Sequence, residues 1–282
     1  MLMTSRRTVL RSALATALLG GCSAGGTSSR SLAQCSGPTK GSLLIIGGGA
    51  QGPEIQGAAV RLARDVDGNP ARWVYIPTAA EDGDLSHAPP PVYTTRDGGT
   101  VTMLHTRDRS EADSPTFVAP LLSATAVYFG GGRQWRLVDA YAGTRTEREL
   151  RAVLDRGGLI SGTSAGATIQ GSYLVRGAPE GNEILMAPGH ERGFGYLTNT
   201  AIDQHVLVRR RASDLSRVVA AREGLLGIGI DESTAVIVRQ NTMSVIGRSV
   251  VLITDGASHD GQPFYALTPG AEFDLATRAV LA

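Results

Sequence analysis

The sequence has few residues that could build a disulfide scaffold or a cysteine-based metal site. Its 282 residues include two cysteines, Cys22 and Cys35. Two cysteines exclude a multi-disulfide framework and a zinc site made of thiolates. If Cys22 carries a lipid, as argued below, Cys35 has no partner at all.

An excess of charge of one sign is also absent. Lysine and arginine number 27 and the acidic residues 26, so the formal net charge is +1. A chain this close to neutrality has no electrostatic reason to bind a polyanion. We therefore expect no nucleic-acid partner.

The N-terminus lacks an apolar run long enough to span a bilayer. Residues 12–19 form a short apolar stretch that follows the pair Arg6-Arg7. A basic segment before a short apolar one is typical of a secretion signal, and the paired arginines indicate the twin-arginine route. Residues 1–21 are predicted to be this signal.

The segment after the signal has the features of a lipid anchor. Leu19-Gly20-Gly21-Cys22 resembles a bacterial lipobox, and small polar residues follow it. We predict that Cys22 is lipidated, that residues 22–41 form a flexible tether, and that the protein faces the periplasm or the exterior. The only membrane contact would be this anchor. The alternative is an ordinary signal cut near Ala24, which would discard Cys22.

Strand and helix patterns alternate through residues 42–282, which we predict to be a single domain. Residues 42–46 are continuously apolar, as in a strand buried on both faces of a parallel sheet. Further strands are expected at 73–76, 100–104, 126–129, 159–161 and 225–230, helices at 53–65, 145–155 (after a Thr144–Glu147 capping box) and 209–222, and short strands over 235–254. This alternation predicts an α/β three-layer sandwich with a mainly parallel sheet.

Residues 47–52 satisfy the G-x-G-x-x-G pattern of dinucleotide-binding proteins. That function also requires an acidic residue at the end of the second strand. Here the strand runs into Pro77-Thr78-Ala79-Ala80, and the first carboxylate is Glu81. A tight turn beside an active site explains these glycines better.

Gly162-Thr163-Ser164-Ala165-Gly166 fits G-x-S-x-G between a predicted strand and a predicted helix. In a nucleophile elbow the serine adopts a cramped conformation that only small neighbours permit. Its hydroxyl then projects from the sheet edge towards N–H groups that can stabilise an oxyanion. The alternative is a glycine-rich turn with an incidental serine.

A serine nucleophile needs a base and an acid. His205 ends an apolar segment and is the preferred base among five histidines, the others being His87, His105, His190 and His259. Glu232 is the preferred acid because it ends a buried-looking strand. Asp231, Glu180 and Glu183 stay open as competitors. The order serine, histidine, acid differs from that of α/β-hydrolases.

Four segments together resemble the cyanophycinase-like serine peptidases of peptidase family S51. They are residues 129–134 (a glycine loop followed by Gln134), 162–167, 203–211 and 227–232. The resemblance implies a flavodoxin-like α/β fold related to class I glutamine amidotransferases. It also implies a substrate that is a peptide or isopeptide containing aspartyl residues.

The resemblance implies a role for each matching residue. Ser164 would attack the substrate, His205 would be general base and then acid, and Glu232 would orient it. The N–H groups of Gly132 and Ala165 would stabilise the oxyanion. The substrate pocket would be lined by Gln134, Asp203, Arg209 and Arg211. No metal and no cofactor is implied.

The chain departs from this family at one position. The family commonly has a third arginine where this chain has Asp214. Either Asp214 lines the pocket and alters the choice of substrate, or it points to solvent and Arg217 supplies the charge. Two further functions stay open, an aspartyl dipeptidase-like hydrolase and a non-catalytic lipoprotein that binds a small acidic ligand. A homodimer is compatible with the sequence, which does not determine the oligomeric state.

Overall fold

The computed structural model describes residues 34–64, 67–81, 85 and 89–281, all of which belong to one compact unit. The predicted secretion signal, Cys22, the start of the tether and His87 lie outside the described residues. The expectations about them stay predictions. In the described part of the chain, no helix is both long enough and apolar enough to cross a membrane.

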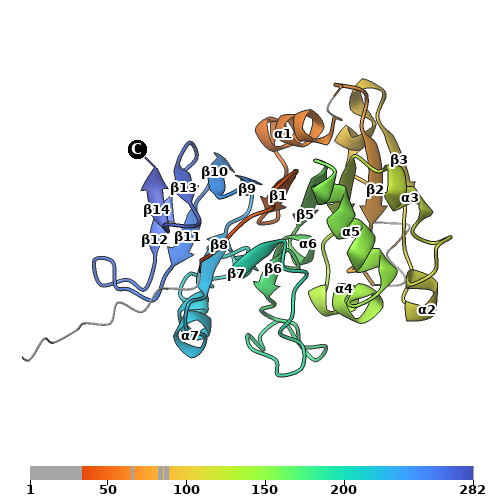
Figure 1. Ribbon diagram of the computed structural model, residues 1–282. Helices are drawn as coiled ribbons and strands as arrows, with labels where there is room; N and C mark the ends of the chain where they lie inside the picture. Colours follow the sequence, from red (N-terminus) through yellow and green to blue (C-terminus); the bar gives the residue numbers. More distant parts are fainter. Residues whose placement is uncertain (1–33, 65–66, 82–84, 86–88, 282) are drawn as a thin grey trace, which may run out of the picture. The chain divides into compact units, whose positions relative to one another are not determined.

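A nine-stranded sheet contains the parallel strands that the sequence predicts (Figure 1). Its order is β14-β13-β10-β9-β1-β5-β4-β2-β3, and β3, β2, β4, β5 and β1 run parallel to one another. The later strands extend the sheet in the antiparallel sense. The strands are β1 (Ser42–Ile46), β2 (Arg72–Ile76), β3 (Thr100–Met103), β4 (Ala126–Phe129), β5 (Leu159–Thr163), β9 (Thr234–Arg239), β10 (Thr242–Gly247), β13 (Glu272–Asp274) and β14 (Ala279–Leu281).

A second sheet of five strands carries two of the predicted site segments at its strand ends. Its order is β12-β11-β8-β7-β6, with β6, β7 and β8 parallel. The strands are β6 (Gly171–Tyr173), β7 (Leu197–Gln204), β8 (Leu226–Ile230), β11 (Val251–Thr254) and β12 (Tyr265–Leu267). The predicted α/β class with its parallel strands is confirmed. The division into two sheets was not predicted.

Strand β1 shows how the layers are held together. All five of its residues are buried. Leu43 and Ile45 belong to a core that also contains Ile202 and Ile230 of the second sheet, whereas Leu44 and Ile46 belong to the core on the opposite face. Because successive strand residues face opposite ways, one continuous apolar run fills both cores.

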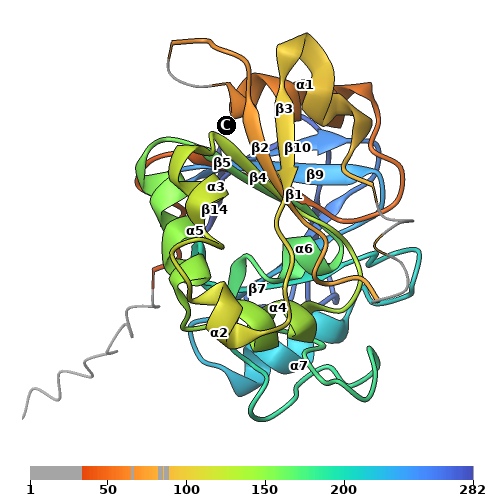
Figure 2. The same cartoon turned by 90° about the vertical axis from the view of Figure 1, so that its right-hand side faces the viewer.

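Helices cover both faces of the larger sheet (Figure 2). On one face lie α1 (Pro53–Ala63) and the 3-10 helix η2 (Val92–Gly98), and on the other lie α4 (Gln134–Tyr141) and α5 (Arg145–Asp155) with the short α2 (Arg109–Ala112) and α3 (Ala119–Ser123). Helix α6 (Ala165–Thr168) follows β5, and α7 (Asp214–Ala221) packs on the second sheet.

Two local predictions are wrong. The helix expected over 209–222 begins only at Asp214, because Asp231 binds the N–H groups of Leu207 and Val208 and holds the preceding segment in a turn. Thr144 does precede α5, but no capping box forms. Its hydroxyl donates to the carbonyl of Tyr141, and Glu147 accepts from the N–H of Gly143.

The core position of β1 gives a stability prediction. Ile45→Ala removes a fully buried side chain, and we expect it to lower the free energy of unfolding by about 2–5 kcal/mol. Val280→Ala, on edge strand β14 with 53% of Val280 exposed, is the control and should cost about 0.5 kcal/mol or less. Urea denaturation of both variants measures the difference, and equal losses would contradict the prediction.

Candidate active site

Ser164 occupies the sharp turn between β5 and α6. Its backbone lies at φ 54° and ψ −113°, which is a strained conformation for a residue with a side chain. The turn is possible because glycines lie two residues before and two residues after Ser164. A Cβ at Gly162 would overlap the carbonyl of Gly166. The Ser164 N–H donates to the carbonyl of Ile46 at 3.1 Å, which ties the turn to β1. This is the geometry expected of a nucleophile elbow.

His205 and Glu232 come from the other sheet, at the ends of neighbouring strands. His205 follows β7 directly and Glu232 lies two residues beyond β8. The parallel pairing of β7 with β8 brings Gln204 opposite Ile230, so both segments leave the sheet at the same edge. The site therefore depends on how the two sheets meet.

A continuous chain of hydrogen bonds joins the three side chains. His205 Nε2 lies 3.0 Å from Ser164 Oγ, and His205 Nδ1 lies 2.6 Å from Glu232 Oε1. The carboxylate can only accept, so Nδ1 carries a proton and Nε2 is left to accept the serine hydroxyl proton. The arrangement can therefore activate the serine.

Burial controls the charge of the imidazole. His205 is 6% exposed, and this desolvation lowers its pKa below the usual value. The hydrogen bond that His205 donates to Glu232 acts in the opposite direction, and the charges of Arg209 and Arg211 act in the same direction as burial. His205 is therefore neutral at neutral pH, as a general base must be.

The glycine turn after β1 packs closely against His205 and Glu232. The N–H of His205 donates to the carbonyl of Gly47 at 3.0 Å, and the N–H of Ser233 donates to Gly48 at 2.9 Å. A Cβ at Gly48 would overlap the imidazole ring, and one at Gly49 would lie 2.7 Å from Glu232 Oε2. The turn beside an active site that the sequence predicted is present, and this close packing explains its glycines without a nucleotide.

The glycine loop after β4 lies next to Ser164. A Cβ at Gly131 would lie 3.4 Å from the Ser164 Cβ, so the glycine loop after β4 runs beside the elbow. In the part of the chain that is described, the N–H groups of Gly132 and Ala165 donate no hydrogen bond. They are available to a negatively charged oxygen.

The residues expected to line the substrate pocket differ in exposure and in the hydrogen-bonding groups that they leave free. Arg209 is exposed. Arg211 is 6% exposed, and its Nη1 is buried without a hydrogen-bond partner. Gln134 is fully buried; its amide donates to the carbonyl of Val175 at 2.8 Å while its Oε1 has no partner.

Asp203 and Asp214 are joined by a residue that the sequence analysis missed. Arg176, in the segment after β6, is 1% exposed and binds Asp203 with Nε and Nη2 and Asp214 with Nη2 at 2.6 Å. Asp214 keeps 29% of its side chain exposed, so it is neither a fully solvated residue nor a free pocket carboxylate. The only feature of the sequence that could have indicated this ion pairing is the position of Arg176 in an apolar segment.

The other candidate acids have different partners. Asp231 accepts from the N–H groups of Leu207 and Val208 and from Ser249 Oγ. Burial acts to raise its pKa, but these hydrogen bonds outweigh burial and hold the pKa below its usual range. Glu180 is exposed, and Glu183, 92% exposed, lies 3.7 Å from Arg211. The side chain of His205 is hydrogen-bonded to Glu232 and Ser164, and to none of these three carboxylates.

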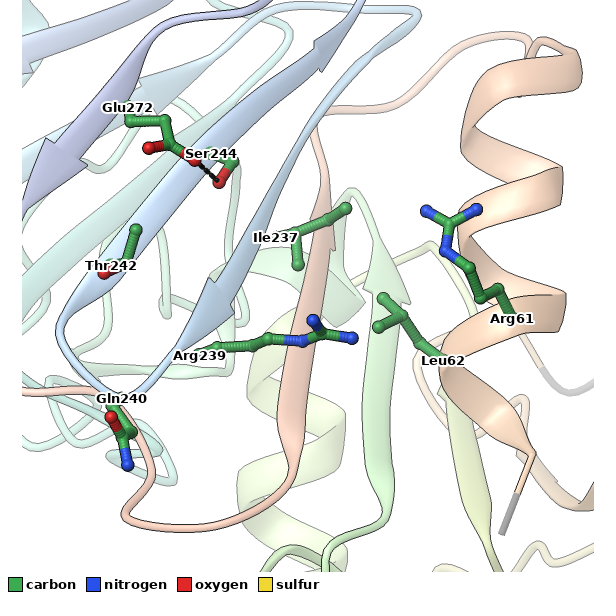
Figure 3. Close-up of a pocket in the computed structure, with 8 residues that line it drawn as sticks. All are labelled: Arg61, Leu62, Ile237, Arg239, Gln240, Thr242, Ser244 and Glu272. Atoms are coloured by element: carbon green, nitrogen blue, oxygen red, sulfur yellow. Dashed lines mark hydrogen bonds between the residues drawn. The ribbon is translucent and has the colours of Figure 1, made fainter. Parts of the chain in front are cut away.

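Nothing else in the described ranges offers comparable chemistry. No cluster of three or more potential metal ligands occurs among these residues. A groove of about 400 Å³ lies between α1 and strands β9, β10 and β13 (Figure 3). Its polar residues partly satisfy one another, since Ser244 donates to Glu272 at 3.2 Å. It contains none of the predicted site residues.

Comparison with known proteins identifies relatives of this fold and sequence. Residues 43–246 match the profile of peptidase family S51. The cyanophycinase of Nostoc sp. is 32% identical over 202 residues, which are 64% of this chain and 67% of the relative. The cyanophycinase of Geminocystis herdmanii is 29% identical over 224 residues, which are 76% and 80% of the two chains.

Solved structures share the fold. A peptidase from an acI-B1 actinobacterium superposes with a TM-score of 0.66 at 23% identity, covering 84% of this chain and 98% of the other. A putative peptidase E protein from Listeria monocytogenes has a TM-score of 0.50 at 14% identity, covering 74% and 99%.

The contact of Gly48 with His205 can be tested by adding one methyl group. Gly48→Ala should displace the imidazole from Ser164 and lower peptidase turnover by about 100-fold, the size expected for a misplacement of about 1 Å. Gly68→Ala is the control, because Gly68 also has a positive φ but nothing lies within 4 Å of its Cβ position. Similar turnover in the two variants would contradict the prediction that contact between a Cβ at position 48 and His205 impairs catalysis.

Proposed function

The chain belongs to peptidase family S51, and on that premise we propose that it is a serine peptidase that cleaves peptide or isopeptide bonds at aspartyl residues. The single observation that carries the serine mechanism is the hydrogen-bonded chain Ser164–His205–Glu232, which starts at a strained elbow. A binding protein would have no use for a buried neutral imidazole placed on a strained serine.

The proposed reaction has two halves. Ser164 Oγ attacks the carbonyl carbon of the scissile bond while its proton passes to His205 Nε2. The carbonyl oxygen becomes an oxyanion that accepts hydrogen bonds from the N–H groups of Gly132 and Ala165. The intermediate collapses, the leaving amine takes the proton from His205, and an acyl-enzyme remains on Ser164.

Water completes the cycle. It gives a proton to His205 Nε2 and attacks the acyl carbon, and the second oxyanion collapses with return of that proton to Ser164 Oγ. The Glu232 carboxylate orients the ring and stabilises the imidazolium through Nδ1. Every proton transferred in this scheme moves through one imidazole nitrogen, and water is the only co-reactant needed to balance it.

The preference for aspartyl residues is supported by Arg211. A guanidinium that is nearly buried, with an Nη1 that lacks a partner, carries a desolvation cost that a ligand carboxylate would relieve. Burial, together with the neighbouring Arg176, lowers the pKa of Arg211, though an arginine stays charged at neutral pH. Arg209 adds a second, exposed cation, and the buried Asp203 lies 4.0 Å from Arg211 Nη1. No cofactor takes part in the scheme.

Replacement of the nucleophile tests the mechanism. Ser164→Ala should reduce peptide hydrolysis by about 10⁵- to 10⁶-fold and abolish labelling by a fluorophosphonate probe, because the hydroxyl that becomes acylated is gone. Ser161→Ala in the preceding strand is the control, since its hydroxyl is buried without a partner. Near wild-type hydrolysis by Ser164→Ala would remove Ser164 from the mechanism.

The acid is tested by a pH profile. Because burial depresses the pKa of His205, the acidic limb of kcat/KM for the wild type should lie below pH 6.5. Glu232→Gln removes an interaction that raises this pKa, so the limb should move to still lower pH while the plateau falls by about 10⁴-fold. Glu180→Gln should change neither, and the opposite ranking would assign the acid to the segment after the nucleophile.

A further inference from the structure

Four charged side chains form a cluster next to the segment that carries His205. They are Arg176 in the segment after β6, Asp203 in β7, Arg211 in the turn before α7, and Asp214 at the start of α7. Asp203 precedes His205 by two residues. Three separate parts of the chain therefore bring their charges to one place beside the active site.

Arg176 has almost no capacity left for a ligand. Its Nε lies 3.0 Å from Asp203 Oδ1, and its Nη2 lies 2.9 Å from Asp203 Oδ2 and 2.6 Å from Asp214 Oδ2. Its Nη1 donates to the carbonyl of Asn182 at 2.8 Å. A guanidinium has five N–H donors, and these contacts use four of them.

Arg211 differs from Arg176 in this respect. Its Nη1 is 4.0 Å from Asp203 Oδ1, beyond hydrogen-bonding distance, and its Nη2 is 3.7 Å from the exposed Glu183. Asp203 is already occupied, because Oδ1 also accepts the N–H of Gln204 at 2.9 Å. Arg211 is therefore the cation of the cluster that is left to meet a substrate.

The charges of the cluster cancel. Two arginines oppose two aspartates: Arg176 is paired with both Asp203 and Asp214, and Arg211 supplies the second positive charge. We propose that Asp214 is a specificity-determining residue: by neutralising Arg176 it limits the site to one substrate carboxylate and excludes peptides with a second acidic group beside the scissile aspartyl residue. This assignment rests on the proposed function.

The physical reason is the low polarity of the site. Arg176 and Asp203 are 1% and 0% exposed, so water screens their charges poorly. One substrate carboxylate can pair with Arg211, with the exposed Arg209 as the remaining positive charge. A second carboxylate would meet a cluster without net positive charge, whereas a neutral or cationic neighbour would meet no such barrier.

Asp214→Asn separates this role from a purely structural one. The amide oxygen can still accept the hydrogen bond from Arg176 Nη2, but the negative charge is lost. Three aspartyl peptides that differ only in the residue joined to the aspartyl carbonyl (arginine, glutamine or glutamate) serve as substrates. The wild type should cleave the glutamate peptide most slowly.

We expect Asp214→Asn to raise the kcat/KM for the glutamate peptide relative to the arginine peptide by about tenfold, which corresponds to about 1.4 kcal/mol. Asp214→Glu should return the ratio towards that of the wild type. Glu183→Gln, which removes an exposed carboxylate near Arg211, should leave the ratio unchanged because solvent already screens that charge.

Two other results would overturn the inference in different ways. If Asp214→Asn slows all three peptides equally and lowers the melting temperature, Asp214 only fastens α7 to the second sheet. If the wild type and the Glu183→Gln variant cleave none of the three peptides, the proposed function fails and the specificity fails with it.

Discussion

The close approach of the glycine turn at residues 47–49 to His205 and Glu232 is the contact on which the site depends. Ser164 belongs to the nine-stranded sheet, and His205 and Glu232 belong to the five-stranded one. The turn follows β1, and its carbonyls accept the N–H groups of His205 and Ser233. A side chain at Gly48 would occupy the position of the imidazole, so the two sheets can present one site only if this position stays bare.

The same constraint explains why several residues of the site have strained backbone conformations. Ser164, His205 and Ser233 all have positive φ angles near 55°. Such conformations persist only where surrounding contacts compel them. Here the compelling contacts are backbone hydrogen bonds to Ile46, Gly47 and Gly48, all in or directly after β1. The strand that fills both cores is thus also the one that positions the reactive side chains.

The charged side chains on the two sides of His205 are arranged differently. Towards Glu232 a single carboxylate orients the ring, and burial keeps the ring neutral. Towards Arg211 the carboxylates of Asp203 and Asp214 hold Arg176, and one arginine is left with an open donor. In the proposed function, the first arrangement serves proton transfer and the second serves recognition of a substrate carboxylate.

Local patterns in the sequence determined the elements: the apolar run of β1, the elbow around Ser164, and the histidine and acid at strand ends could all be predicted, because each depends on neighbours a few residues away. Tertiary structure alone decided the rest. The turn that delays α7, the second sheet, and the pairing of Arg176 with Asp214 across 38 positions all result from contacts between distant segments. Periodicity reports whether a residue is buried, but not which distant charge it meets there.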